Sequence, residues 1–190
     1  MLRNVLLMLL VAGLLGCQAS DPADAGAATD PAVAAERAEL ERLEAQVAAS
    51  REAVAGFEVL QASYGHGPDP LSGQQVPTVK VALANGSTVT VARVSLLATF
   101  ANESGGGPWL DQVFDVPLAD PLAPGGGDAV TMTPRGDSDW ALRAPPEGTP
   151  VRVRVLPLAL QTPDGQRLLT EHAFTEEQRE RLAELRASPP

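Results

Sequence analysis

From residue 57 onward, apolar and polar residues alternate in short runs, and this alternation limits the fold more than any other feature of the chain. A period of two places successive side chains on opposite faces of a strand. Turns rich in glycine and proline separate the runs, and 190 residues suffice for one domain with extensions. We assign strands to 57–64, 78–83, 88–100, 108–118, 128–134 and 151–161. About seven short strands of this kind predict a mainly β fold, a β-sandwich.

Two of these runs contain an interruption. The alternation in residues 88–100 changes phase at Ala92-Arg93, which requires a β-bulge or a loop ahead of the true strand. In the last run, Pro157 follows the alternating Val-Arg stretch 151–155. Because proline cannot donate a ladder hydrogen bond, this run predicts an edge strand or a bulge. Residues 151–155 are therefore our candidate edge for the addition of a strand from a partner protein.

Three glycine-containing segments predict turns. Asn85-Gly86 is a strong turn signal between two alternating runs. The triplets 105–107 and 125–127 are followed neither by Gly-Lys-Ser/Thr nor by the helical stretch that a phosphate-binding loop needs. We therefore expect both triplets to be hairpin loops.

Residues 31–56 lack this alternation and are rich in Ala, Glu, Arg and Leu, which favour an α-helix. A heptad frame with Leu40 at position a makes every a site from 33 to 54 apolar, but Glu36 and Ser50 interrupt the d sites. A buried carboxylate is costly unless it is paired, so the seam is thin. A weak self-pairing coiled coil stays open. A spacer, or a helix docked on the sandwich, is favoured, and we expect a monomer.

A short helix closes the chain. Thr175 and Gln178 have the spacing of a capping box, in which each side chain bonds the other residue's backbone N–H. Leu182 and Leu185 then supply an apolar stripe. The predicted domain thus spans residues 57–187, a β-sandwich with a C-terminal helix.

The first sixteen residues have the composition of a signal peptide. Arg3 supplies a positive start, and the apolar run 5–15 is too short to span a bilayer as a helix. Leu14-Leu15-Gly16-Cys17 resembles the bacterial lipobox. This resemblance implies that residues 1–16 are removed and that Cys17 carries diacylglycerol and an N-linked acyl chain such as palmitate. Residues 17–30 are small, polar and proline-bearing, which predicts a flexible tether.

Charge and cysteine content narrow the possible partners. Gln18 stands where an Asp commonly retains lipoproteins in the inner membrane, so the lipobox resemblance implies the outer membrane, on its periplasmic side. The net charge is −10 and Lys80 is the only lysine, which argues against nucleic acid as a partner. An acidic chain is not attracted to anionic lipid headgroups either, so we expect its attachment to the membrane to depend on the anchor at Cys17. A single cysteine excludes an internal disulfide and a cysteine-based metal cage, and we expect no cofactor.

Several pieces of the chain are similar to one family. They are Asn85 in the first turn, residues 92–100, Pro108-Trp109, residues 121–134, Trp140 and residues 174–185. On these pieces, residues 57–187 resemble a family of uncharacterised proteobacterial lipoproteins related to the FxLYD-type, immunoglobulin-like domain. The resemblance implies an immunoglobulin-like β-sandwich and a lipid anchor, and it implies no activity.

Trp109 and Trp140 are the candidate interaction residues. Each follows turn residues and lies at the start or end of a strand. An aromatic ring with a polar edge suits the rim of a sandwich core, and this is the favoured role. The same rings could form a stacking platform for a ligand or the centre of a protein interface.

Other chemistry-bearing residues form no recognisable site. His66 and His172 lie in different segments, whereas zinc needs three or four ligands and a hydrolase needs a nucleophile, a base and an orienting group. Residues 135–138 spell the integrin-binding Arg-Gly-Asp-Ser, but turns favour these residues for backbone reasons. Asp137 and Asp139 are too few for a calcium loop.

We therefore expect a non-enzymatic, lipid-anchored envelope protein whose β-sandwich binds a protein partner in the periplasm. The alternative is a carrier or sensor of a small or lipidic ligand in a cleft near Trp109 and Trp140. A hydrolase with an unfamiliar site is the least favoured reading.

Overall fold

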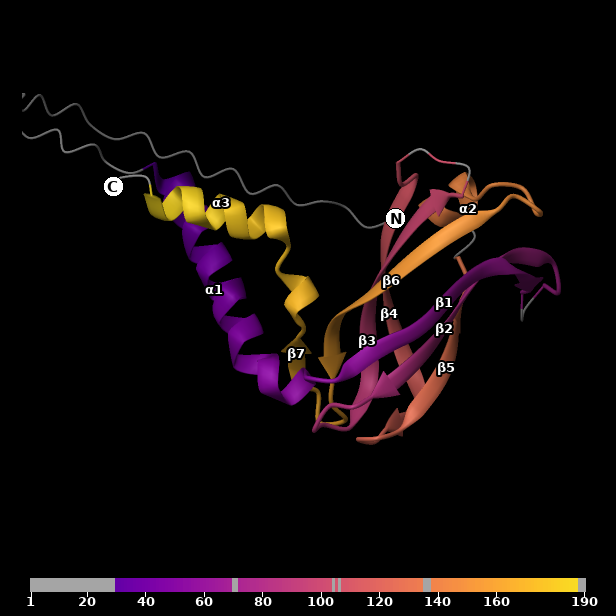
Figure 1. Cartoon of the computed structure of the whole chain (residues 1–190), viewed down its shortest axis with the longest axis horizontal. Coiled ribbons are helices and arrows are strands. Elements are labelled where there is room, and N and C mark those ends of the chain that lie inside the picture. The colour runs from indigo at the N-terminus through magenta and orange to yellow at the C-terminus, as the bar shows by residue number, and fades with distance from the viewer. Residues whose placement is uncertain (1–29, 70–71, 104, 106, 135–137, 188–190) are drawn as a thin grey trace, which may run out of the picture.

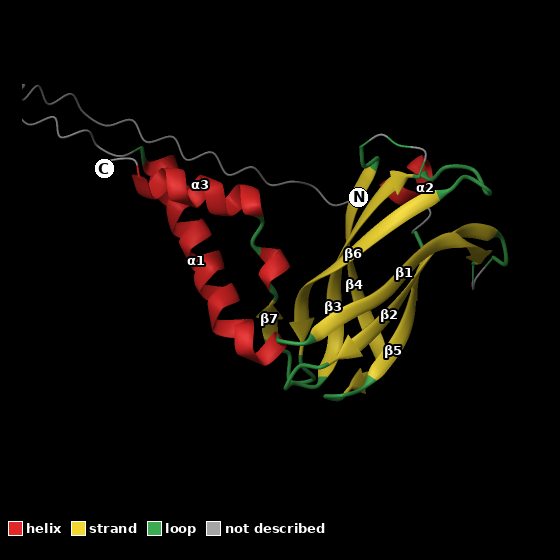
Figure 2. Cartoon of the chain, viewed as in Figure 1, coloured by secondary structure: helices red, strands yellow, loops and turns green. Residues whose placement is uncertain are grey.

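The computed structural model describes residues 30–69, 72–103, 105, 107–134 and 138–187. These residues form a V, with two antiparallel sheets in one arm and the long N-terminal and C-terminal helices in the other (Figure 1). Figure 2 shows the same division between strands and helices. The predicted mainly β fold, preceded by a long helix and closed by a short one, is confirmed at this level.

Seven strands make up the β domain. The first sheet has the order β1-β2-β5, and the second has the order β4-β3-β6-β7. Their bounds are β1 Phe57–Pro68, β2 Gln75–Asn85, β3 Val91–Asn102, β4 Leu110–Leu122, β5 Gly127–Met132, β6 Val151–Gln161 and β7 Arg167–Leu169. The helical elements are α1 Pro31–Val54, α2 Asp139–Arg143, the 3₁₀ turn η1 Glu171–Ala173 and α3 Glu176–Ala187.

The core lies between the inner faces of the two sheets. Alternate side chains of β2 and β3 are no more than 1% exposed and meet there: Val79, Val81, Leu83, Val94, Leu96, Ala98 and Phe100. Full burial of each Val, Leu or Phe side chain among them contributes about 1.5–3 kcal/mol. The period-two pattern therefore identified the inward face of both strands correctly.

The strand pairing is irregular at both predicted interruptions, and at the second it is a β-bulge. The pairing of β3 with β4 shifts register between Val91 and Arg93, where the alternation changes phase. The pairing of β3 with β6 shifts where Ser95 faces Ala159 and Leu96 faces Pro157, which leaves Leu158 as the extra residue. A proline beside a bulge avoids the loss of a ladder bond.

Of the two alternatives for the run 151–161, the bulge is confirmed, and an edge without a second ladder is found at residues 151–155 but not along the whole strand. β6 lies between β3 and β7, and its last residues, 159–161, pair with β7. Residues 151–157 pair with β3 alone among the described strands, but β1 lies beside their other side without a ladder. The candidate edge 151–155 is therefore partly covered by the neighbouring sheet.

One predicted turn and one predicted hairpin loop connect the two sheets, so the expectation of a hairpin at residues 125–127 is wrong. Asn85-Gly86 ends β2 and leads to β3, and residues 125–127 lead from β4 to β5. Asn85 is only 1% exposed. Its Nδ2 donates to the carbonyl oxygens of Val89 at 2.9 Å and Leu122 at 2.7 Å, and its Oδ1 accepts from the Ser87 hydroxyl at 2.5 Å. The side chain thus ties the end of β2 to the end of β4.

Both long helices begin as predicted. Asp30 Oδ1 accepts from the Ala32 N–H at 2.9 Å, with Pro31 at the first helical position. Thr175 and Gln178 form the capping box, with their side-chain oxygens 3.3 and 2.9 Å from the partner backbone nitrogens. Caps of this kind are typically worth about 1 kcal/mol each.

The apolar stripe of α1 packs within the chain. We define the helical arm as α1, η1 and α3, which share a second cluster made of Leu40, Val47, Phe174, Leu182 and Leu185. The stripe therefore packs against η1, α3 and the adjoining β7, and not on the inner core. The helix is therefore docked on its own chain, which is one of the alternatives favoured from the sequence, through contacts with β7 and α3.

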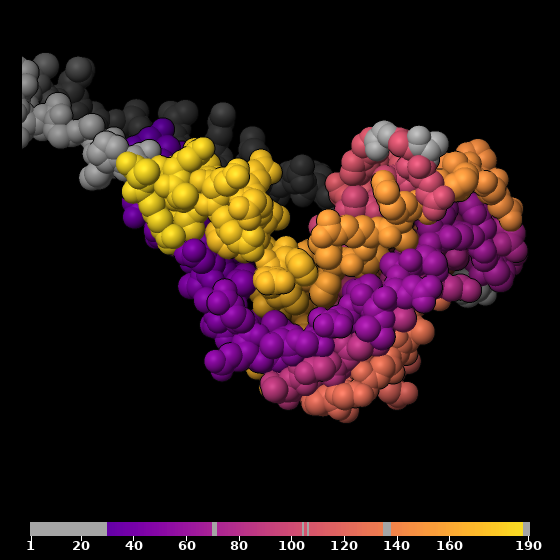
Figure 3. All heavy atoms as spheres, viewed as in Figure 1, coloured from indigo at the N-terminus to yellow at the C-terminus, as the bar shows by residue number. Residues whose placement is uncertain are grey.

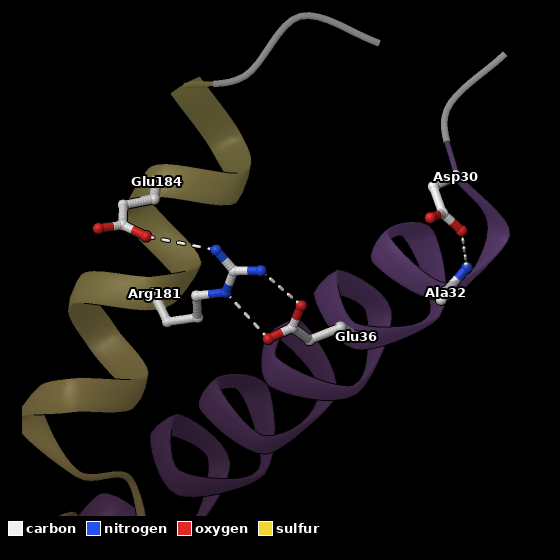
Figure 4. A network of polar contacts seen from close by, with 5 residues as sticks. All are labelled: Asp30, Ala32, Glu36, Arg181 and Glu184. Atoms are coloured by element: carbon white, nitrogen blue, oxygen red, sulfur yellow. Dashed lines mark hydrogen bonds and ion pairs between the residues drawn. The ribbon is translucent and has the colours of Figure 1, made fainter.

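The two polar residues that interrupt the seam have partners, and Figure 4 shows the partner of Glu36. Glu36 accepts two hydrogen bonds from the Arg181 guanidinium on α3, at 2.9 and 2.8 Å, and these bonds lower the pKa of Glu36. Ser50, which is 6% exposed, donates to the Gln46 carbonyl and accepts from the Leu169 N–H of β7 at 3.2 Å. Both residues therefore fix α1 to the rest of the chain.

Candidate functional site

The two tryptophans belong to one aromatic cluster at the far end of the β domain from α1. The Phe100 ring lies between them, with its centroid 5.3 Å from both the Trp109 and the Trp140 centroids. Phe114 meets Trp140 edge-on at 5.3 Å. Trp140 is 0% exposed and lies in the first turn of α2, not at a strand end, whereas Trp109 is half-buried just before β4. Both rings thus pack at the core, as favoured from the sequence.

The polar edges of this cluster lack ideal partners. The Tyr64 hydroxyl and the Trp140 indole nitrogen are buried without a hydrogen bond of good geometry. Burial raises the pKa of Tyr64, and the neighbouring Trp140 side chain opposes that rise. Because Trp140 is sealed by aromatic rings, it can contact a ligand only after the cluster opens.

A hollow lies instead where the helical arm meets the β domain. We call it the junction groove, and its volume is about 490 Å³. In Figure 3 a notch separates the helical arm from the β domain above this junction. The lining residues are Val47, Arg51, Val54, Ala55, Gly56, Phe57, Glu58, Val59, Val155, Leu156, Pro157, Thr170, Glu171 and His172. The groove is therefore built from the consecutive elements α1 and β1 on one side, and from β6 and η1, far later in the sequence, on the other.

The groove combines an apolar floor with a charged rim. Val54, Phe57 and Val155 are buried core side chains that form the floor. Glu58 and Glu171 supply negative charge at the rim. Arg51, also on the rim, has no ion pair among the described residues. The groove therefore has apolar side chains at its centre and charged side chains around them.

A close backbone contact fixes the end of the groove. Gly56 links α1 to β1 with a φ of +83°, and its carbonyl accepts from the Gly86 N–H at 2.9 Å. A Cβ added at Gly56 would come within 2.9 Å of the Gly86 carbonyl oxygen. Only glycine combines this φ with so close an approach, so the joint sets the position of α1.

Of the remaining candidate residues, His66 lies on β1 with its ring 5.8 Å from that of Tyr64, and His172 lines the junction groove. The structure does not bring them together. Cys17 and Arg135–Asp137 lie outside the described residues. Ser138 caps α2 by accepting from the Ala141 N–H at 3.2 Å.

Within the described residues, no group of three or more His, Cys, Asp or Glu is placed to hold a metal ion. None of the described helices is long and apolar enough to cross a membrane.

Comparison with known proteins adds no family. No protein-family model matches the chain, and no curated protein matches it.

Proposed function

We propose that this chain is a non-enzymatic, lipid-anchored envelope protein whose immunoglobulin-like β-sandwich binds a protein partner through the junction groove. The observation that carries the proposal is the groove itself, an open hollow of about 490 Å³ with buried apolar side chains beneath a charged rim. The two packed antiparallel sheets agree with an immunoglobulin-like sandwich, and with the resemblance to FxLYD-type lipoproteins.

The anchor that we propose is a diacylglycerol on Cys17, on the periplasmic side of the outer membrane. Its support is the lipobox-like sequence and Gln18. Thirteen residues, 18–30, separate Cys17 from α1, and they span at most about 45 Å when extended. The 24 residues of α1 add about 36 Å. The groove, at the other end of α1, would therefore face partners beyond the headgroups.

The alternative of a ligand carrier near Trp109 and Trp140 has less support. Trp140 is fully buried, both indole rings pack on Phe100, and neither tryptophan lines the junction groove. The non-enzymatic reading is supported by the separation of the two histidines, since His66 lies toward the far end of β1 and His172 lies in the groove.

Site-specific photocrosslinking in intact cells tests this function. A photoreactive amino acid at Glu58, on the rim, should crosslink to a discrete protein. The same amino acid at Thr131, exposed on the other side of the domain, should not. Ala55→Trp should fill the groove and remove the crosslink, whereas Ala129→Trp on β5 should not, with both variants melting as the parent does. Equal crosslinking from both positions, or a crosslink that survives Ala55→Trp, would contradict the proposal.

A further inference from the structure

The outer faces of the two sheets differ in chemistry. On the three-stranded sheet, the outer pairs of β2 and β5 are small or polar, such as Lys80 with Thr131 and Ala82 with Ala129, and the exposed Leu60 of β1 stands alone at a register shift. On the four-stranded sheet, Leu97 of β3 faces Val113 of β4 and Leu156 of β6. Val113 is 52% exposed. An apolar row thus crosses three strands on the solvent side of only one sheet.

A charged row runs parallel to this apolar row. One step along β3 on the same face, Thr99 lies between Asp111 of β4 and Arg154 of β6. Both charged side chains are exposed, and neither has an ion pair among the described residues. We call these two rows together the Leu97 face. Within it, Asp111 and Arg154 lie one strand away from β3 on opposite sides, both at the level of Thr99.

We propose that two copies of the chain associate through their Leu97 faces, around a two-fold axis that runs along β3. Such an axis exchanges β4 of one copy with β6 of the other. Leu156 then lies over the partner's Val113, and the two Leu97 side chains meet at the axis. Arg154 lies over the partner's Asp111, and this ion pair forms twice. A two-fold interface requires self-complementarity of this kind, and face-to-face sheets pack about 10 Å apart.

The size of the face makes this a weak dimer. Three strands span about 14 Å, and five outward positions along β3 span about 27 Å. Each copy therefore buries on the order of 400 Å², which is in the range of transient contacts. The net charge of −10 on each copy adds repulsion, which salt screens beyond about 8 Å. Dimers should thus form at high concentration, or where membrane attachment concentrates the chain.

This dimer does not rest on the proposed partner, but Leu156 belongs both to the Leu97 face and to the lining of the junction groove. The dimer also differs from the coiled coil considered for residues 31–56, because the α1 stripe is already packed within the chain. A chain that starts at residue 18 contains both hydrophobic clusters, which draw on residues between Val33 and Leu185. That chain is suitable for the test and lacks Cys17.

Sedimentation equilibrium from low micromolar to several hundred micromolar tests the dimer. The parent should dimerise reversibly, and Arg154→Asp and Asp111→Arg should each weaken association by at least about tenfold. The double variant should regain the parent affinity, because the ion pair reforms with its charges exchanged. Lys80→Asp, a charge reversal on the other sheet, should leave association unchanged. A monomer throughout the range, or a double variant as weak as the single ones, would overturn the proposal.

A crosslinking measurement tests the same interface without the charge-reversal variants, so the test stands even where one of those variants fails to fold. Leu97→Cys introduces the only thiol of the chain from residue 18, and a short bis-maleimide should join two copies across the axis. Lys80→Cys is the matched control and should stay monomeric under the same conditions. Equal crosslinking of the two variants would contradict an interface at the Leu97 face.

Discussion

Replacing Asn85 should destabilise the β domain more than its position in a turn suggests. Its side chain makes hydrogen bonds to the carbonyls of Val89 and Leu122 and to the backbone and hydroxyl of Ser87, and it is 1% exposed. A typical hydrogen bond contributes about 1 kcal/mol net, and a buried group left without a partner costs about 1–3 kcal/mol. Asn85→Ala removes both donors to buried carbonyls, so we expect a loss of about 3–4 kcal/mol in the free energy of unfolding.

Two further variants separate the donor and acceptor contributions at this site. Ser87→Ala removes one hydroxyl that bonds the Asn85 Oδ1 and should cost only about 1 kcal/mol. Asn85→Asp keeps the shape but places a carboxylate against the two carbonyls. Because this buried charge has no cationic partner there, Asn85→Asp should be less stable than Asn85→Ala at neutral pH.

Denaturant unfolding followed by tryptophan fluorescence measures these differences, since both tryptophans contact the core. A loss below about 1 kcal/mol for Asn85→Ala would show that water replaces the side chain's hydrogen bonds. Equal stability of Asn85→Asp and the parent would show that the two carbonyls do not depend on a donor. Either result would refute the reasoning.

Three further predictions concern the anchor, the helical arm and the joint. The parent should incorporate an alkyne fatty acid in cells and Cys17→Ser should not, so an unlabelled parent would contradict lipidation. The hydrogen bonds from α3 lower the pKa of Glu36. Their contribution to the free energy of unfolding is therefore fully present above the ordinary carboxylate pKa and is lost as the pH falls through the lowered pKa. Glu36→Gln should flatten the acid side of the stability–pH curve, because glutamine does not titrate. Gly56→Ala should lower the melting temperature more than Gly73→Ala. Both positions have positive φ, but only at Gly56 does a Cβ meet the backbone of Gly86, and equal shifts in the two variants would argue against that contact.

Local periodicity predicted most of the secondary structure, because each of the long elements shows its own repeat. The last helix, 176–187, and the start of α1 at Pro31 match the structure through their caps. β7 has three residues and α2 has five, so neither is long enough to show a period. Turn signals marked where the chain bends, but not which sheet the next strand joins.

The candidate site was harder to predict from the sequence. Glu36 and Ser50 looked like defects in a coiled-coil seam, because their partners, Arg181 and Leu169, are more than a hundred residues away. The junction groove has the same origin, since α1 and β1 meet residues of β6 and η1 that lie far from them in the sequence. Arg51 in the last turn of α1 was the available local signal for the groove. A helix end that faces solvent often carries the same kind of residue, so the sequence could not tell the two apart.

The C-terminal half of α1 is braced against the β domain at several points. The Ser50 hydroxyl accepts from the Leu169 N–H of β7, the Ala53 carbonyl accepts from the Thr88 N–H, and the Gly56 carbonyl accepts from the Gly86 N–H. The groove residues of α1 lie in this braced half, whereas the N-terminal end of the helix lies about 36 Å from the joint. The width of the groove is therefore set by the fold itself, and a force applied at the far end of α1 is taken up by α3 before it reaches the groove.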